Sequence, residues 1–186
     1  MGGDPDHVAM VTGLIEVKLG VDALNPLQQN TDHDSLYQAD VELVRALAPA
    51  GEVKRVERDE RLFSSGDAAG GVYLIVKGTA RATLAGAEHE LMCRTAGPGA
   101  VLGLTSALCA KQYQFDVQAL ETVEAVFLET GTVNEILRGQ PELCMRAMQM
   151  MCNELDALRQ TREHMQSCGN ESCALHEQCC QAARLQ

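Results

Sequence analysis

Apolar residues between positions 53 and 128 fall in short runs that alternate with polar residues, and glycines separate several of these runs. The runs are 53–56, 72–76, 80–84, 88–94, 115–119 and 123–128. A period of two is typical of half-buried strands. The nearly continuous apolar run 72–76 suits a strand buried on both faces. Regular short strands with glycine turns predict an antiparallel β-roll or barrel.

Helical spacing precedes these strands. From Ser35 onward, Leu36, Leu43, Val44 and Leu47 recur at helical intervals, and P-A-G ends the run. The pattern predicts one short amphipathic helix before the roll.

A long helix is predicted after the strands. A short helix over 132–137 is followed by Pro141, which suits a first helical turn, and no Gly or Pro follows until after Met165. The apolar residues at alternating four- and three-residue steps are Cys144, Met148, Met151, Leu155, Leu158 and Met165. These steps form the a/d seam of a coiled coil, interrupted by Arg162. The first two turns are expected to cover the roll. Beyond Leu155 the helix is expected to extend past its own domain, which favours a homodimer through Pro141 to Met165.

The pattern as a whole predicts a mainly β fold with flanking helices (α+β). Its core is an antiparallel double-stranded β-roll or jelly roll, followed by a long C-terminal helix. The chain divides into an unassigned N-terminal extension (1–34), the roll with its leading helix (35–140), the long helix (141–165) and a cysteine-rich tail (166–186).

Composition narrows the class of protein. The 186 residues include 15 Lys and Arg against 26 Asp and Glu, a formal net charge of −11. Because nucleic-acid binding depends on cations that neutralise phosphates, no direct nucleic-acid binding is expected. Trp is absent and aromatic residues make up only 3% of the chain, so a core of aliphatic residues, Met and Cys is expected.

The N-terminus predicts no export signal and no membrane span. It starts M-G-G-D-P-D-H, without the basic residues of a secretory signal. The apolar run from Val8 to Val21 is interrupted by Gly13, Glu16 and Lys18, so it is not expected to cross a bilayer. We therefore expect a soluble, cytoplasmic protein whose cysteines are reduced thiols.

Four segments in order carry a family resemblance: L-F-S-S-G-D from Leu62, V-Y-L-I-V-K-G from Val72, A-G-P-G-A-V-L-G-L-T-S-A-L from Ala96 and V-Q-A-L-E from Val117. Together with the long helix they resemble the effector domain of the CRP/FNR regulators, which has the cyclic-nucleotide-binding fold. The resemblance covers about Val53 to Met165. It implies a regulatory module in which a cyclic nucleotide lies on a short helix start, with Arg on the phosphate and Glu on the ribose.

The nucleotide-binding cassette departs from that family pattern, which is roughly F-G-E-[LI]-[AG]-L, a loop, then R-[ST]-A-x-V-x-A. In V-L-G-L-T-S-A-L, Gly103 matches the family glycine and Leu104 stands where the Glu is expected. In Y-Q-F-D-V-Q-A, Tyr113 stands at the Arg position, Gln114 at the Ser/Thr position and Phe115 at the small Ala.

These replacements argue against tight cAMP binding. A charge-assisted hydrogen bond is worth about 1.5–3 kcal/mol, and the nearest cation is Lys111, two residues before Tyr113. Two interpretations remain. In one, the cassette residues bind another small molecule of unknown identity; these residues are Gly103, Leu104, Thr105, Ser106, Tyr113 and Gln114. In the other, the pocket is filled by the protein's own side chains, including Phe115.

The C-terminal tail is a second candidate site for sensing a signal. Cys168, Cys173, Cys179 and Cys180, with His164 and His176 nearby, are soft ligands of the type that zinc and iron–sulfur sites use. The spacing is not the paired C-x-x-C of a zinc ribbon. The alternatives are therefore a redox or metal sensor and a thiol-rich tail without a metal.

Other functions find less support in the sequence. Only 21 residues follow Met165, and Arg184 is their single Lys or Arg, so no helix-turn-helix reader is expected there. A cupin-like enzyme would need His and Glu ligands in the strands, where His89 stands alone. A non-enzymatic regulatory module is the leading hypothesis.

Overall fold

The computed structural model describes residues 34–85, 90–109 and 111–168. Eight strands form two four-stranded sheets. The first has the order β1 (Glu52–Val56), β8 (Val123–Glu129), β3 (Gly71–Lys77) and β6 (Val101–Leu102). The second has the order β2 (Arg61–Phe63), β7 (Asp116–Ala119), β4 (Ala80–Ala85) and β5 (Glu90–Ala96).

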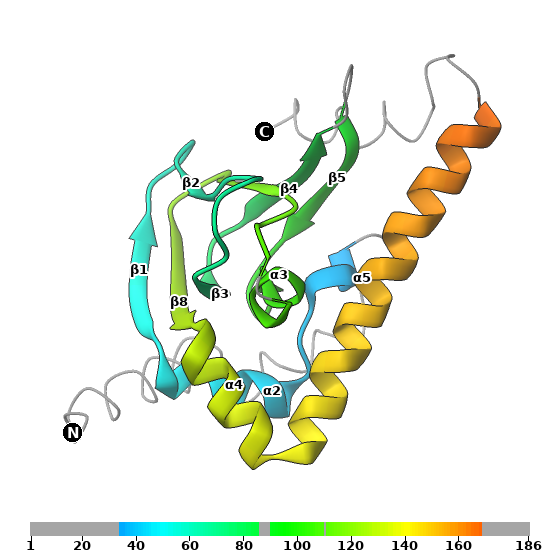
Figure 1. The fold of residues 1–186 in the computed structure, drawn as a ribbon. Coiled ribbons are helices and arrows are strands. Elements are labelled where there is room, and N and C mark those ends of the chain that lie inside the picture. Colours follow the sequence, from blue (N-terminus) through cyan, green and yellow to red (C-terminus); the bar gives the residue numbers. More distant parts are fainter. Residues whose placement is uncertain (1–33, 86–89, 110, 169–186) are drawn as a thin grey trace.

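Every strand pairing within the two sheets is antiparallel. Helices flank the sheets, and a long helix follows the last strand (Figure 1). The predicted fold class, a β-roll followed by a long helix, is therefore confirmed.

Strand β3 shows how the apolar pattern builds the roll. Successive side chains of a strand point to opposite faces. Leu74 and Ile75 are both fully buried, but Leu74 packs in one hydrophobic cluster and Ile75 in another. The continuous apolar run at 72–76 thus separates two cores rather than covering one.

The helices are η2 (Asp34–Tyr37), α2 (Val41–Leu47), η3 (Ala48–Ala50), α3 (Leu104–Leu108), α4 (Thr130–Gly139) and α5 (Pro141–Cys168). The prediction of one continuous helix from Ser35 is wrong, because a 3₁₀ turn and a separate α-helix occupy that region. Asp40 caps the second helix, since its carboxylate accepts a hydrogen bond from the Glu42 N–H at 2.9 Å. Between the two helical pieces, Gln38 forms an isolated β-bridge with Ala100.

Helix α5 runs along one side of the roll and ends three residues beyond the predicted Met165 (Figure 1). In its first turns, the buried side chains of Leu143 and Ala147 pack against the domain. The Arg146 guanidinium also contacts the Asp40 carboxylate at 2.6 Å.

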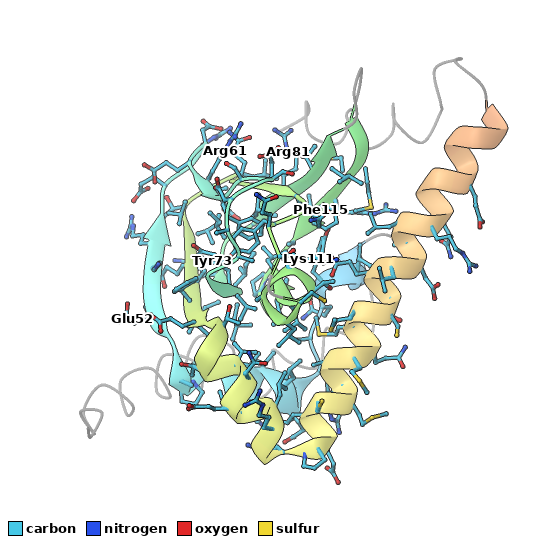
Figure 2. All side chains as sticks on the ribbon, viewed as in Figure 1. Glu52, Arg61, Tyr73, Arg81, Lys111 and Phe115 are labelled. Carbon is cyan, nitrogen blue, oxygen red and sulfur yellow. The ribbon has the colours of Figure 1, made fainter. Side chains whose placement is uncertain are left out.

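Two hydrophobic clusters fill the domain, and they differ in composition. The aliphatic cluster, built around Leu43, Leu74 and Leu128, includes residues of α2, α4 and α5. The aromatic cluster holds the four buried aromatic side chains, Tyr37, Phe63, Tyr113 and Phe115. Both clusters consist mostly of aliphatic residues, as the composition predicts, and the few buried aromatic residues are concentrated in the second cluster. The side chains between the two sheets are drawn in Figure 2.

Candidate functional site

The cassette begins at a glycine with a left-handed backbone. Gly103 caps α3 with φ +81° and ψ 7°, a conformation that favours glycine. A Cβ at this position would lie 2.7 Å from the Tyr113 ring. The glycine therefore lets the Tyr113 ring lie directly against the start of α3.

Tyr113, which the sequence resemblance places at the position of the family arginine, is 5% exposed. Its hydroxyl donates to the Gly71 carbonyl oxygen at 2.7 Å and accepts from the Gly71 N–H at 3.3 Å. Its ring stacks on Phe63, with the centroids 4.0 Å apart. Burial raises the pKa of the Tyr113 phenol, which keeps it neutral.

Phe115 and Tyr37 extend the aromatic packing toward α5. The two rings meet edge to face with centroids 6.0 Å apart, and both are buried. Figure 2 shows Phe115 and Lys111 on the side of the roll that faces α5. Phe115, which the sequence resemblance places at a small residue of the family pattern, belongs to the aromatic cluster.

The other predicted ligand residues face different surroundings. Leu104 packs into the aliphatic cluster, and Ser106 is buried. The Thr105 hydroxyl donates to the Glu154 carboxylate of α5. Gln114 is exposed, and its amide donates to the Gln112 carbonyl oxygen at 3.0 Å. Of the six predicted ligand-binding residues, Gly103 and Tyr113 come from different parts of the cassette and lie in direct contact.

Sequence reasoning missed a polar group beside α5. Arg94 pairs with buried Ala82 across β4 and β5, so its side chain starts on the inner face of the sheet. The charges of Glu154 and Arg94 act on the Tyr37 phenol, whose pKa is raised chiefly by burial. Glu154 raises this pKa further, and Arg94 lowers it. The alternation of 88–94 could have placed Arg94 inward, whereas nothing local could have indicated Glu154.

Helix α5 has two apolar faces. Cys144 and Met151, both in the predicted seam, pack on the aliphatic cluster, and Leu158 packs on the aromatic cluster. Four other side chains form an exposed stripe: Met145 (62% exposed), Met148 (44%), Cys152 and Leu155 (56%). The predicted seam is therefore divided between the domain's own core and the outer face of the helix.

Most of the predicted metal site lies outside the described residues. Cys173, Cys179 and Cys180 are not described, and Cys168 is the last residue of α5. A zinc or iron–sulfur site in the tail stays a prediction. Within residues 34–85, 90–109 and 111–168, no group of three or more His, Cys, Asp or Glu side chains could hold a metal ion.

A family model described as "Cyclic nucleotide-binding domain" matches residues 53–140, which span β1 to the end of α4. Over these residues the chain is similar to the cyclic nucleotide-binding domain family. The resemblance inferred from the sequence is confirmed, and no helix-turn-helix domain is seen in the described part of the chain.

Solved structures share this fold. The N-terminal domain of a transcriptional regulator from Streptomyces coelicolor A3(2) has 22% identity and a TM-score of 0.50, covering 68% of this chain and 89% of that chain. The catabolite activator protein of Thermus thermophilus has 19% identity and a TM-score of 0.57, covering 70% of this chain and 62% of that chain.

A third structure is titled "A cyclic-GMP-dependent signalling pathway regulates bacterial phytopathogenesis". It has 15% identity and a TM-score of 0.58, covering 64% of this chain and 96% of that chain. At these identities the likeness establishes the fold alone. A search of curated proteins finds no significant match. None of the described helices has both the length and the apolar character needed to cross a bilayer.

Proposed function

We propose that this chain is a non-enzymatic regulatory module of the CRP/FNR effector type whose nucleotide cassette is closed by its own aromatic side chains. In this proposal the module works as a homodimer through α5. The observation that carries the first part is the Tyr113 side chain, which is bonded to Gly71 and stacked on Phe63 at the position of the family arginine.

The chemistry of Tyr113 does not suit a cyclic phosphate. A neutral phenol gives an anion no charge pairing, and its hydroxyl already donates to the Gly71 carbonyl oxygen. Leu104 offers no acceptor to a ribose hydroxyl and is buried in the aliphatic cluster. Both polar contacts that the family resemblance implies are therefore missing.

Ligand entry would also require Tyr113 to move. Two hydrogen bonds and one stacked aromatic pair would be lost, about 3 kcal/mol in total at typical values. A binding-competent state that is this rarely populated weakens the apparent affinity by about two decades. The cost of moving Tyr113 and the missing charge pairing both weaken the expected affinity for a cyclic nucleotide.

Calorimetric titration with cAMP and with cGMP, in reducing, metal-defined buffer, tests this part of the proposal. The wild-type protein is expected to give no binding heat at millimolar nucleotide. The matched variant Leu104→Glu/Tyr113→Arg, which restores both family contacts, is expected to bind at least one of the two nucleotides more tightly. Micromolar binding by the wild type would overturn the proposal.

The dimer part rests on the exposed stripe of α5. Four apolar side chains at three- and four-residue steps, on a 28-residue helix, fit the same stripe of a second copy around a two-fold axis. We expect sedimentation velocity at about 10 μM to give a dimer.

The double variant Met148→Glu/Leu155→Glu should give a monomer with an unchanged fold, because it places like charges across the two-fold axis. Gln160→Glu, an exposed change on the same helix, is the matched control and should stay dimeric. A wild-type monomer would remove the dimer from the proposal and leave the cassette argument standing.

A further inference from the structure

Sulfur-bearing side chains are concentrated in one stretch of α5. Six of the nine residues from Cys144 to Cys152 are Cys or Met. Three of the six pack against the aliphatic cluster: Cys144, Met150 and Met151. The other three have exposed side chains: Met145, Met148 and Cys152. The helix therefore divides its sulfur atoms, drawn in yellow in Figure 2, between the domain's core and its outer surface.

The three exposed sulfur residues lie on one face of the helix. Met145 and Met148 are three residues apart, and Met148 and Cys152 are four apart. Residues at these spacings are neighbours on a helix surface, with Cβ atoms about 5–6 Å apart. The Cα–Cβ bonds of a helix tilt toward its N-terminus, which directs Cys152 toward Met148 and Met148 toward Met145. Methionine is unbranched and has three rotatable bonds, so its sulfur can adapt to a neighbour.

We propose that Met145, Met148 and Cys152 form a binding site for a soft monovalent metal ion, Cu(I). The ligands are the two thioether sulfurs and the Cys152 thiolate, and the thiol releases its proton to solvent when the ion binds. One thiolate balances the charge of one monovalent cation. The site needs a single helix, so it does not depend on the proposed dimer.

The type of ligand selects the metal. Thiolate and thioether sulfurs are soft ligands that suit Cu(I), whereas Mg²⁺, Ca²⁺ and Mn²⁺ take oxygen ligands. Zinc sites are built from Cys, His, Asp and Glu, and in the described part of the chain no group of three or more such residues could hold an ion. Two thioethers with one thiolate therefore favour Cu(I) over zinc.

The charges beside these residues favour a cation. Glu142 and Asp156 are exposed carboxylates, one turn before and one turn after the three sulfur residues. Arg146 is the basic residue between them, and its guanidinium contacts the Asp40 carboxylate at 2.6 Å. The carboxylates therefore attract a cation to this face of α5, an attraction that salt weakens because the face is exposed.

Competition with the Cu(I) chelator bathocuproine disulfonate, without oxygen, tests the site. In the full chain used for this test, the tail cysteines are changed to Ser so that the separately predicted tail site does not take the ion; they are Cys168, Cys173, Cys179 and Cys180. This protein is expected to bind one Cu(I) per chain.

Variants of this protein identify the ligands. Loss of a group that only orients a metal ligand costs about 10–100-fold in affinity, so Cys152→Ser and Met148→Leu should each weaken binding by at least about tenfold. Met150→Leu, at a methionine that packs on the aliphatic cluster, is the matched control and should leave the affinity unchanged. Leu replaces Met with little change in volume, so Met148→Leu should keep the oligomeric state in sedimentation velocity.

The methyl signals of methionine give a second readout for each residue. In protein labelled with ¹³C on its methionine methyl groups, Ag(I) serves as a soft monovalent probe that air does not oxidise. The signals of Met145 and Met148 should shift and saturate at one equivalent, whereas those of Met150 and Met151 should stay in place.

The outcomes separate this site from the dimer. Absence of Cu(I) binding, or binding that Cys152→Ser and Met148→Leu both leave unchanged, would overturn the proposal whatever the oligomeric state. A monomer that binds Cu(I) through these residues would support the site and remove only the dimer.

Discussion

Two hydrophobic clusters meet at β3: the aliphatic cluster around Leu43, Leu74 and Leu128, and the aromatic cluster around Tyr113. They differ in the kind of contacts that their side chains make. The aliphatic cluster joins the first sheet to the helices through side chains that make no directional bonds. In the aromatic cluster, rings stack, meet edge to face and bond to backbone at specific atoms. The second cluster occupies the part of the domain where the family resemblance expects a ligand.

Under the proposed function, this difference means that the shape of a binding cassette can be present without the ligand chemistry that the family resemblance implies. Gly103 keeps its left-handed backbone and α3 follows it, as an anion site would need. Tyr113 and Phe115 nevertheless bring packing where charge pairing is expected. Fold and ligand chemistry are set by separate residues of one domain, so the fold alone does not give the ligand.

Truncating the buried Tyr113 side chain should give the largest loss of stability. Tyr113→Ala deletes a buried ring and its two hydrogen bonds, and should lower the free energy of unfolding by about 3–5 kcal/mol. Urea unfolding measures the loss. Because the cavity has the shape of the deleted side chain, added p-cresol should raise the Tm of this variant more than that of the wild type. Leu43→Ala, in the aliphatic cluster, is the matched control and should gain nothing specific from p-cresol.

Adding a methyl group at the cassette glycine, Gly103, should give the next largest loss of stability. Gly103→Ala combines a positive φ with a close approach of Cβ to the Tyr113 ring, and should cost about 2–3 kcal/mol. In a Tyr113→Ala background the close approach disappears and the φ strain remains, so the cost should fall to about 1 kcal/mol. Equal costs in the two backgrounds would contradict the contact between Gly103 and Tyr113.

Removing only the Tyr113 hydroxyl separates packing from hydrogen bonding. Tyr113→Phe keeps the stack on Phe63 and leaves the Gly71 N–H and carbonyl without this partner. The expected cost is about 1–2 kcal/mol in urea unfolding. A neutral result would mean that the hydroxyl adds nothing beyond the ring.

The smallest effect is expected at the edge of the aromatic cluster, where Tyr73 contacts Phe63 on one side and Phe127 on the other. The Lys54 ammonium lies 3.8 Å from the centroid of the Phe127 ring, and Tyr73 contacts the same ring. Lys54→Ala should cost about 0.5–1 kcal/mol, the value of a solvent-exposed cation–π contact. A loss as large as that of Tyr113→Ala would show that the exposed edge and the buried centre of the aromatic cluster do not differ as described.

Much of the framework could be predicted from the sequence, because alternation survives in any strand longer than about four residues. Strands β2 and β6 were missed because three and two residues carry no readable period. The break between η2 and α2 was missed because Leu36 falls at a helical interval from Leu43 by coincidence. The polar Asp40 before an apolar run was the available signal for the cap.

The candidate site could be predicted only in part. Tyr113 was placed at the arginine position by counting from Val117, but its bond to Gly71 joins residues 42 positions apart. The Thr105–Glu154 contact spans 49 positions. Such pairs follow from how the roll closes and from where α5 crosses it, and no local pattern encodes either. Arg94 was within reach, because the strand alternation fixes its face.

The most direct test of the central claim is an NMR titration of protein labelled with ¹³C on its tyrosine rings. The chain has three tyrosines, so Tyr37→Phe and Tyr73→Phe assign the Tyr113 signal. The account predicts that this signal stays unchanged up to millimolar cAMP or cGMP, and that Tyr113 ionises only above the ordinary phenol range because burial raises its pKa. A saturable shift of the Tyr113 signal at micromolar nucleotide would contradict the account, because it would mean that the ring leaves its place to admit a ligand.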